Sequence, residues 1–215
     1  MQTDKMTNPQ KGRLGERLVE LYVNDELIPS LKKDEGWTDI VYTEAFFKSP
    51  RSPVFPESLR KFEEEREARL ILTNGFCPTK EFLEYFRKLT SSLSNIPDGF
   101  LIKMKRTGIY KTVKEAVEEF EVTCNARFED INGNPVLKVP KKNTRLPVVN
   151  GEIEVVEVKS GKSYTLQVPS YKNALANGYH LRLFKVDLNS FEIREKLMLS
   201  PDEVDSDYFK AMKIV

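Results

Sequence analysis

The sequence predicts an α/β fold in which helices flank a mixed central sheet. Segments with apolar residues at helical spacing are interspersed along the chain with short apolar or alternating runs of strand length. Their order, helix, strands, helix, strand, favours helices packed on a sheet. With 215 residues, 40% of them hydrophobic, the chain is long enough to bury a substantial core. We expect residues 1–10 to form a disordered tail and residues 11–215 to form a single domain.

The helices are predicted from the spacing of apolar side chains and from the residues that end them. The first begins at Lys11, because Leu14, Leu18 and Leu21 fall on one face, and we expect it to end just before Pro29. Further helices are predicted over residues 57–70, 79–92, 112–121 and 169–177.

The strands are predicted from apolar or alternating runs bounded by turn residues. Ile96-Pro97-Asp98-Gly99 is a turn that leads directly into an apolar strand. Asn132-Gly133 and Asn150-Gly151 are expected to form two further tight turns. The other predicted strands cover residues 37–47, 123–128, 136–139, 181–186 and 191–198.

Net charge argues against one class of function. A value of only +1 is too small for a protein that coats polyanions generally, but an enzyme that acts on nucleic acid can offset its basic contacts with an acidic metal site. Two basic stretches stand out, residues 103–114 and residues 138–145. Each is either a solvated surface or a nucleic-acid contact.

Cysteine usage and the absence of a long apolar run bear on the compartment. Nothing at the start of the chain resembles a signal peptide, and no apolar run approaches 18 residues. The only two cysteines, Cys77 and Cys124, make neither a metal cluster nor a disulfide framework, although a bridge between them stays possible. We therefore expect an intracellular protein with no membrane partner.

The most informative segment is residues 152–163. Side chains alternate across a strand, so Glu157 and Lys159 share one face while Val156 and Val158 share the other, where they can be buried. A carboxylate that could bind a metal ion then lies beside a cation that could orient water or stabilise developing negative charge. The alternative reading of Glu157 and Lys159 is a surface ion pair without chemistry.

Several motifs lie in a suggestive order around this segment. Pro97-Asp98-Gly99 precedes a strand, Glu157-Val-Lys159 follows on a later strand, and Gln167-Val-Pro-Ser-Tyr171 comes next. This order resembles the PD-(D/E)XK nuclease superfamily, with the Gln-x-x-x-Tyr motif of its RecB-like branch. Gly12-Arg-Leu-Gly-Glu16 is similar to the first helix of archaeal Holliday-junction resolvases.

The resemblance implies a restriction-endonuclease-like fold and a Mg²⁺- or Mn²⁺-dependent DNA nuclease, of which a junction resolvase is one form. Asp98, Glu157 and Glu16 would be the metal ligands, and Lys159 would position the attacking water or stabilise charge at phosphorus. Gln167 and Tyr171 would brace the site. Nucleic-acid contacts are expected from Lys162, Lys103 and Lys105. A homodimer acting on DNA is also implied, since cutting two strands invites two sites.

Some alternatives stay open. Asp98 and Glu157 lie 59 positions apart, so we interpret residues 104–150 as an insertion; otherwise Asp130 is the rival ligand. A protein on the same fold that binds nucleic acid or assembles without cleaving it is the other functional reading. Gly161-Lys162-Ser163 is not a phosphate-binding P-loop, because Val156 stands where that motif needs glycine. His180, the only histidine, is expected to be structural.

Overall fold

The computed structural model of the chain describes residues 6–44, 65–93, 97–122, 140–160 and 168–204. The predicted strands 123–128 and 136–139, the turn at Asn132-Gly133 and most of the predicted helix 57–70 lie outside these residues. Of the tail predicted over residues 1–10, residues 1–5 also lie outside the described residues.

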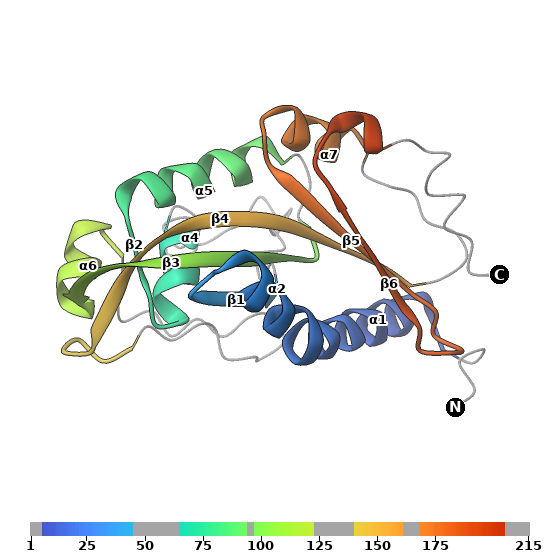
Figure 1. The fold of residues 1–215 in the computed structure, drawn as a ribbon, viewed down its shortest axis with the longest axis horizontal. Helices are drawn as coiled ribbons and strands as arrows, with labels where there is room; N and C mark the ends of the chain where they lie inside the picture. Colours follow the sequence, from blue (N-terminus) through green and yellow to red (C-terminus); the bar gives the residue numbers. More distant parts are fainter. Residues whose placement is uncertain (1–5, 45–64, 94–96, 123–139, 161–167, 205–215) are drawn as a thin grey trace, which may run out of the picture. The chain divides into compact units, whose positions relative to one another are not determined.

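The described strands form one mixed six-stranded sheet with helices around it, as the sequence predicted (Figure 1). The order of neighbours is β1-β3-β4-β5-β6, and β2 also pairs with β4. Strands β4 and β5 are parallel, as are β2 and β4, whereas β5 and β6 are antiparallel. The strands are β1 Asp39–Glu44, β2 Cys77–Pro78, β3 Gly99–Thr112, β4 Arg145–Ser160, β5 His180–Val186 and β6 Ile193–Met198.

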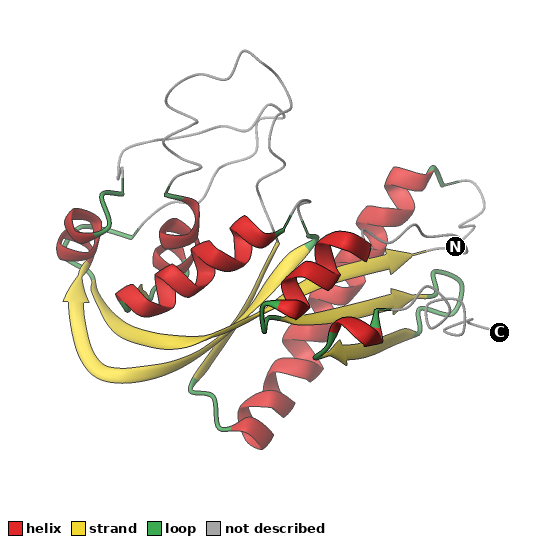
Figure 2. Cartoon of the chain, turned by 90° about the horizontal axis from the view of Figure 1, so that it is seen from above, coloured by secondary structure: helices red, strands yellow, loops and turns green. Residues whose placement is uncertain are grey.

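The helices agree with most of the predicted ranges. Figure 2 distinguishes them from the strands by colour. They are α1 Asn8–Tyr22, α2 Ile28–Glu35, α4 Arg66–Thr73, α5 Lys80–Ser92, α6 Val113–Glu119 and α7 Val168–Ala176, with a 3₁₀ turn at Pro201–Glu203. The predictions for 79–92, 112–121 and 169–177 are therefore confirmed.

The end predicted for the first helix is wrong. A π-helical turn, Val23–Leu27, joins α1 to α2, and Pro29 lies in the first turn of α2. Proline has no N–H for an i→i−4 bond, and the run passes it by means of the π-helical turn, in which the preceding Ile28 N–H donates to the Val23 carbonyl five residues back. The helical run ends instead at Gly36, whose φ of +68° is left-handed and suits a glycine at a helix C-terminus.

The turn predicted at Asn150-Gly151 is also wrong, because β4 runs through both residues. On the N-terminal side of Asn150, Val148 and Val149 pair with β2. On the C-terminal side of Gly151, residues 154–160 pair with β5. Strand pairing on both sides outweighs the local turn preference. Strand β3 is likewise longer than the apolar run at its start and continues to Thr112.

The chain divides into two compact units. Unit 1 comprises Met1–Phe46, Leu89–Lys103 and Ile153–Val215, and unit 2 comprises Phe47–Lys88 and Met104–Glu152. The segment 104–150, interpreted from the sequence as an insertion, thus falls in unit 2 together with residues 47–88, which include most of α5. Strands β3 and β4 contribute to both units.

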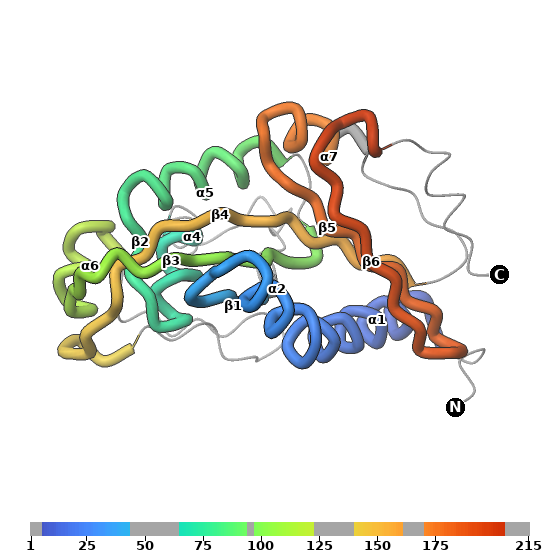
Figure 3. The backbone as a smooth tube through the Cα atoms, in the orientation of Figure 1, coloured from blue at the N-terminus to red at the C-terminus, as the bar shows by residue number. Residues whose placement is uncertain are grey.

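The core of unit 1 lies on one face of the sheet. Val156 and Val158 on β4 share that face with Phe184 on β5, because Val158 and Phe184 are register partners. These side chains are buried against α1, the π-helical turn and α2. Figure 3 shows α1 passing beside β5. The prediction that both valines are buried is confirmed.

Unit 2 has an apolar core of its own. Leu72 of α4, Leu83 of α5 and Ala116 of α6 pack with Leu146 and Val148 at the start of β4. Cys77 on β2 belongs to the same cluster and is a free, fully buried thiol. Among the described residues of both units, no helix has the length and apolar character needed to cross a membrane.

Candidate active site

Strand β4 presents Glu157 and Lys159 on the face opposite Val156 and Val158. The Lys159 Nζ donates a hydrogen bond to Glu157 Oε1. The Glu157 side chain is almost fully buried, while 20% of the Lys159 side chain is exposed. A buried carboxylate needs compensating partners, so this pair is not a loosely held surface ion pair.

Asp98 reaches the same segment from the turn before β3. Its backbone N–H donates to the Val156 carbonyl at 3.1 Å. Its Oδ2 accepts a hydrogen bond from the Val158 backbone N–H at 2.7 Å. The Asp98 side chain is therefore fixed beside the backbone that links Glu157 to Lys159. The hydrogen bonds to β4 bring Asp98 close to Glu157 although 59 positions separate them in the sequence.

Tyr171 approaches Glu157 from α7. It is fully buried, and its hydroxyl donates to Glu157 Oε2. Burial raises the pKa of the Tyr171 phenol, and the negative charge of Asp98 raises it further. The hydroxyl therefore stays protonated and remains a donor. Both oxygens of Glu157 accept a hydrogen bond, one from Lys159 and one from Tyr171.

Helix α1 brings Glu16 near this group through a close contact of Gly15 with β4. A Cβ at Gly15 would lie 2.7 Å from the Ser160 Cβ, which is too close for two carbon atoms, so this position needs glycine. Ser160 Oγ also donates to the Lys11 carbonyl at 3.0 Å, which ties the helix to the end of the strand. The Gly-x-x-Gly-Glu pattern of the sequence thus includes one glycine that permits the approach of α1 to β4.

The electrostatics of Lys159 identify which charges surround it. Burial lowers the pKa of the Lys159 ammonium, and the negative charges of Asp98 and Glu16 raise it again without restoring the ordinary value. The group therefore combines one ammonium with three carboxylates, those of Asp98, Glu157 and Glu16. Among the described residues, these come from α1, the turn before β3, and β4.

This set of donors fits a hard divalent cation. Mg²⁺ and Mn²⁺ prefer carboxylate oxygens, and Mg²⁺ is often held by only one or two protein carboxylates. Each oxygen of Asp98 and Glu157 has more than one lone pair, so hydrogen bonding to protein donors does not exhaust their capacity. Three carboxylates against one ammonium also leave a local excess of negative charge.

A second charged cluster in unit 1, which the sequence did not predict, lies on the other face of β4. Glu154 is fully buried, and its carboxylate accepts from Arg182 Nε at 2.6 Å and pairs with Lys103 Nζ at 2.8 Å. Lys103 also pairs with Glu35 at 3.2 Å, and Arg182 with Glu195 at 3.4 Å. No local pattern indicates this cluster, because its members come from α2, β3, β4, β5 and β6.

The position of Lys103 differs from the exposed nucleic-acid contact that was expected. Its side chain is buried, with the ammonium held between Glu154 and Glu35 and 5.3 Å from the centre of the Trp37 ring. In this conformation Lys103 does not present its charge to a phosphate. Lys105, two residues later, is exposed and belongs to unit 2.

Glu154 and His180 also deserve consideration as metal ligands, since their ligand atoms lie within 4.8 Å of each other. They are register partners on β4 and β5. Burial alone would raise the pKa of Glu154, but hydrogen bonds and charge from Arg182, with Lys103, hold it below its usual value. Because two cations already neutralise Glu154, the pair suits a structural role better than a metal site.

Three residues considered from the sequence lie outside the described part of the chain: Gln167, Lys162 and the rival ligand Asp130. Their roles stay predictions.

Comparison with known proteins adds no relatives. No protein-family model, curated protein or solved structure matches the chain.

Proposed function

We propose that this protein is a divalent-metal-dependent nuclease that hydrolyses phosphodiester bonds in DNA, with a restriction-endonuclease-like core of the PD-(D/E)XK kind. The observation that carries the proposal is the approach of Asp98 to the segment Glu157–Lys159, through the hydrogen bond from Val158 to its carboxylate. The resemblance also names Tyr171 and Glu16: the Tyr171 hydroxyl donates to Glu157, and the Glu16 carboxylate acts on the charge of Lys159.

In this proposal the carboxylates hold the metal ion. Asp98 and Glu157 would be direct ligands, and Glu16 would act directly or through water. The bound ion would supply a Lewis acid and lower the pKa of a coordinated water. Val158 keeps the Asp98 carboxylate in place, and Tyr171 fixes the orientation of the Glu157 carboxylate, so both ligands are held before the ion arrives.

Lys159 would act on the substrate. The Lys159 ammonium lies next to Glu157, and the side chain is partly exposed. The ammonium could therefore turn from Glu157 Oε1 toward a phosphate oxygen. A cation aimed at the phosphorus centre stabilises the negative charge that develops there during hydrolysis. The same ammonium could donate a hydrogen bond that orients the attacking water.

A second candidate function is binding or assembly on nucleic acid without cleavage. It is favoured by the fact that both Glu157 oxygens already accept hydrogen bonds from Lys159 and Tyr171. A group satisfied in this way can be a structural ion pair that needs no metal. The two functions differ in one measurable respect, which is metal-dependent hydrolysis.

The test is cleavage of linear duplex, single-stranded, flapped and four-way-junction DNA with Mg²⁺, with Mn²⁺ and with EDTA. We expect metal-dependent cleavage of at least one substrate. Glu157→Gln, Asp98→Asn and Lys159→Met should each lower the rate by about a hundredfold or more, as expected for groups that bind the metal or stabilise charge.

Two residues outside the proposed site serve as matched controls. Lys172→Met changes an exposed lysine on α7, and Glu20→Gln removes a partly exposed carboxylate one helical turn after Glu16. Both should leave cleavage unchanged, whereas Glu16→Gln should reduce it. Cleavage that persists in Glu157→Gln and Lys159→Met would refute the site. Binding without cleavage by the unaltered protein would favour the second function.

A homodimer belongs to the same proposal, because cutting both strands of a symmetric substrate calls for two active sites. Sedimentation equilibrium with and without a four-way junction would measure the mass of the active species. A monomer that makes paired cuts would contradict this part of the proposal and leave the catalytic part intact.

A further inference from the structure

The two basic stretches of the sequence meet in unit 2. The Val113 N–H donates to the Thr144 carbonyl at 2.9 Å, and the Lys114 N–H donates to the Lys142 carbonyl at 3.0 Å. These bonds join the first residues of α6, which follow β3 directly, to the turn that precedes β4. We refer to residues 105–114 and 141–145 together as the basic ribbon.

The β3 part of the basic ribbon is exposed on both faces. All six residues from Lys105 to Tyr110 are exposed, whereas a strand with one covered face alternates between buried and exposed side chains. Two large apolar side chains are among them: Ile109 is 60% exposed and Tyr110 is 49% exposed. Gly108, with φ of +85°, places a left-handed residue inside the strand, as in a bulge.

Charge is concentrated on this ribbon. It carries seven lysine and arginine residues, against three glutamates on α6, although the net charge of the whole chain is only +1. The glutamates of α6 offset only part of this charge: Lys111 pairs with the partly exposed Glu119, and Lys114 is 3.9 Å from Glu118 in a pair exposed on both sides. The exposed Lys114–Glu118 pair is weak and is easily replaced by a polyanion.

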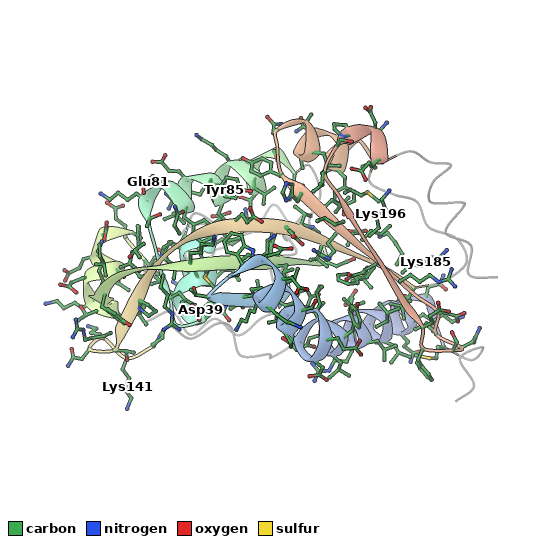
Figure 4. All side chains as sticks on the ribbon, in the orientation of Figure 1. Asp39, Glu81, Tyr85, Lys141, Lys185 and Lys196 are labelled. Carbon is green, nitrogen blue, oxygen red and sulfur yellow. The ribbon has the colours of Figure 1, made fainter. Side chains whose placement is uncertain are left out.

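An aromatic ring distinguishes the kind of polyanion. The Arg145 guanidinium lies 5.6 Å from the centre of the exposed Tyr110 ring. A ring and a guanidinium held together can stack on nucleobases while neighbouring cations contact phosphates. An acidic protein would use the cations but has no bases to stack. Figure 4 shows the Lys141 side chain projecting away from the turn before β4.

We propose that the basic ribbon of unit 2 binds nucleic acid, with Tyr110 and Arg145 stacking on bases and Lys141 and Lys142 contacting the phosphate backbone. This inference rests on the proposed nuclease function and deepens it, since it assigns substrate binding to residues of unit 2 that are separate from the catalytic group in unit 1. The arrangement favours single-stranded or unpaired regions, where base faces are accessible to an aromatic ring.

Binding is tested apart from catalysis. Fluorescence anisotropy of labelled single-stranded and duplex DNA is measured with the Glu157→Gln protein in EDTA, at several salt concentrations. Replacing Lys141 and Lys142 together by alanine should weaken binding. For single strands, the slope of log K against log salt concentration should decrease in magnitude by about 1.4, because each phosphate contact contributes about 0.7. Lys32→Ala/Lys33→Ala, which removes two exposed lysines of α2, is the charge-matched control and should leave the slope unchanged.

Stacking is tested at Tyr110. Tyr110→Ala should weaken single-strand binding about five- to hundredfold, and Tyr110→Phe should restore it, because phenylalanine keeps the ring. Equal loss in the alanine and phenylalanine variants would overturn stacking. Competition by polyglutamate as effective as competition by unlabelled DNA, with no effect of Tyr110→Ala, would identify a general polyanion surface and overturn the inference.

The outcomes separate this inference from the nuclease proposal. If the protein cleaves DNA but the ribbon variants bind as tightly as the parent, the inference is wrong and the nuclease proposal stands. If DNA binds through the ribbon but no metal supports cleavage, the inference stands and the nuclease proposal fails.

Discussion

The Glu157 carboxylate shows how individual residues of the site depend on one another. It is buried between a phenol and an ammonium, and each donor satisfies a different oxygen. Removing either donor leaves a buried acceptor short of a partner, which costs more than the hydrogen bond itself contributed. Tyr171 allows this cost to be measured without changing any charge.

We predict that Tyr171→Phe lowers the free energy of unfolding by about 1–3 kcal/mol, the usual penalty for an unsatisfied buried polar group. Urea denaturation monitored by circular dichroism measures the change. Tyr110→Phe is the control, because that hydroxyl belongs to an exposed side chain, and its effect should stay within about 0.5 kcal/mol. Equal stability of Tyr171→Phe and the parent would show that the phenol does not hold Glu157.

Glu154 leads to a prediction about pH. Arg182 and Lys103 hold the pKa of this carboxyl below its ordinary 4.5 despite burial. The folded state therefore binds the proton more weakly than the unfolded state. The stability that this difference contributes is present above pH 4.5 and is lost as the pH falls through the lower, folded-state pKa.

We predict that Glu154→Gln destabilises the protein by about 3–5 kcal/mol at pH 7, because Arg182 and Lys103 lose the buried carboxylate that they share. The gap between parent and variant should narrow as the pH falls below 4.5, which denaturation at several pH values measures. Glu118→Gln, in an exposed pair with Lys114, should change stability by less than about 0.5 kcal/mol. A gap independent of pH would contradict the ionised state of Glu154.

These residues also mark the limit of sequence-based prediction at this scale. Asp98, Glu157 and Lys159 were grouped because each stands in a recognisable local pattern, and the structure brings them together; their catalytic roles stay predictions. Lys103 has no such pattern, since its partners Glu35 and Glu154 lie 68 and 51 positions away. Burial of a lysine by distant carboxylates follows from tertiary packing alone.

At the scale of elements, the contact of α1 with β4 determines where Glu16 lies. The helix contains two glycines with opposite surroundings. Gly15 faces Ser160, whereas a Cβ at Gly12 would have nothing within 4 Å. The same chemical change at the two positions therefore has opposite consequences.

We predict that Gly12→Ala stabilises the protein by up to about 1 kcal/mol, through higher helix propensity. Gly15→Ala should destabilise it by about 1–3 kcal/mol, because the new methyl group forces α1 from β4. In Gly15→Ala/Ser160→Gly most of this loss should return, since the next contact is Val158 at 3.8 Å. Thermal unfolding of the parent, Gly15→Ala, Ser160→Gly and the double variant forms a double-mutant cycle, and additive effects of the two changes would contradict the direct contact.

The errors in predicted elements have a common physical origin. Turn and helix-breaking residues were read as boundaries at Pro29 and Asn150-Gly151, yet the chain continues through both. Pro29 follows a π-helical turn through which the helical run continues, and an Asn-Gly pair is extended when strand partners flank it. Helices with strong apolar periodicity, such as 79–92, were predicted well because their own sequence determines the face that they bury.

At the scale of the whole molecule, two apolar clusters raise the question of how many cooperative transitions the chain has. Each unit has a core of its own, yet β3 and β4 each contribute residues to both. If one unit unfolds, the ends of β3 and β4 that lie in it lose their hydrogen-bonded neighbours. The remaining parts of the same two strands, in the other unit, are then less firmly held. Strand continuity thus favours one transition over two.

We predict that both units unfold with the same denaturant midpoint, and the chain offers a probe in each. Trp37, the only tryptophan, reports unit 1 by fluorescence. Cys77 reports unit 2 through its reactivity with thiol reagents. Burial is the largest cause that raises the pKa of the Cys77 thiol to about 11, so the thiol of the folded protein should resist these reagents near neutral pH. In a Cys124→Ser background, pulse labelling of Cys77 across a urea series should give the midpoint of the Trp37 transition. Labelling of Cys77 at lower urea than the fluorescence change would instead establish that unit 2 opens independently, despite the shared strands.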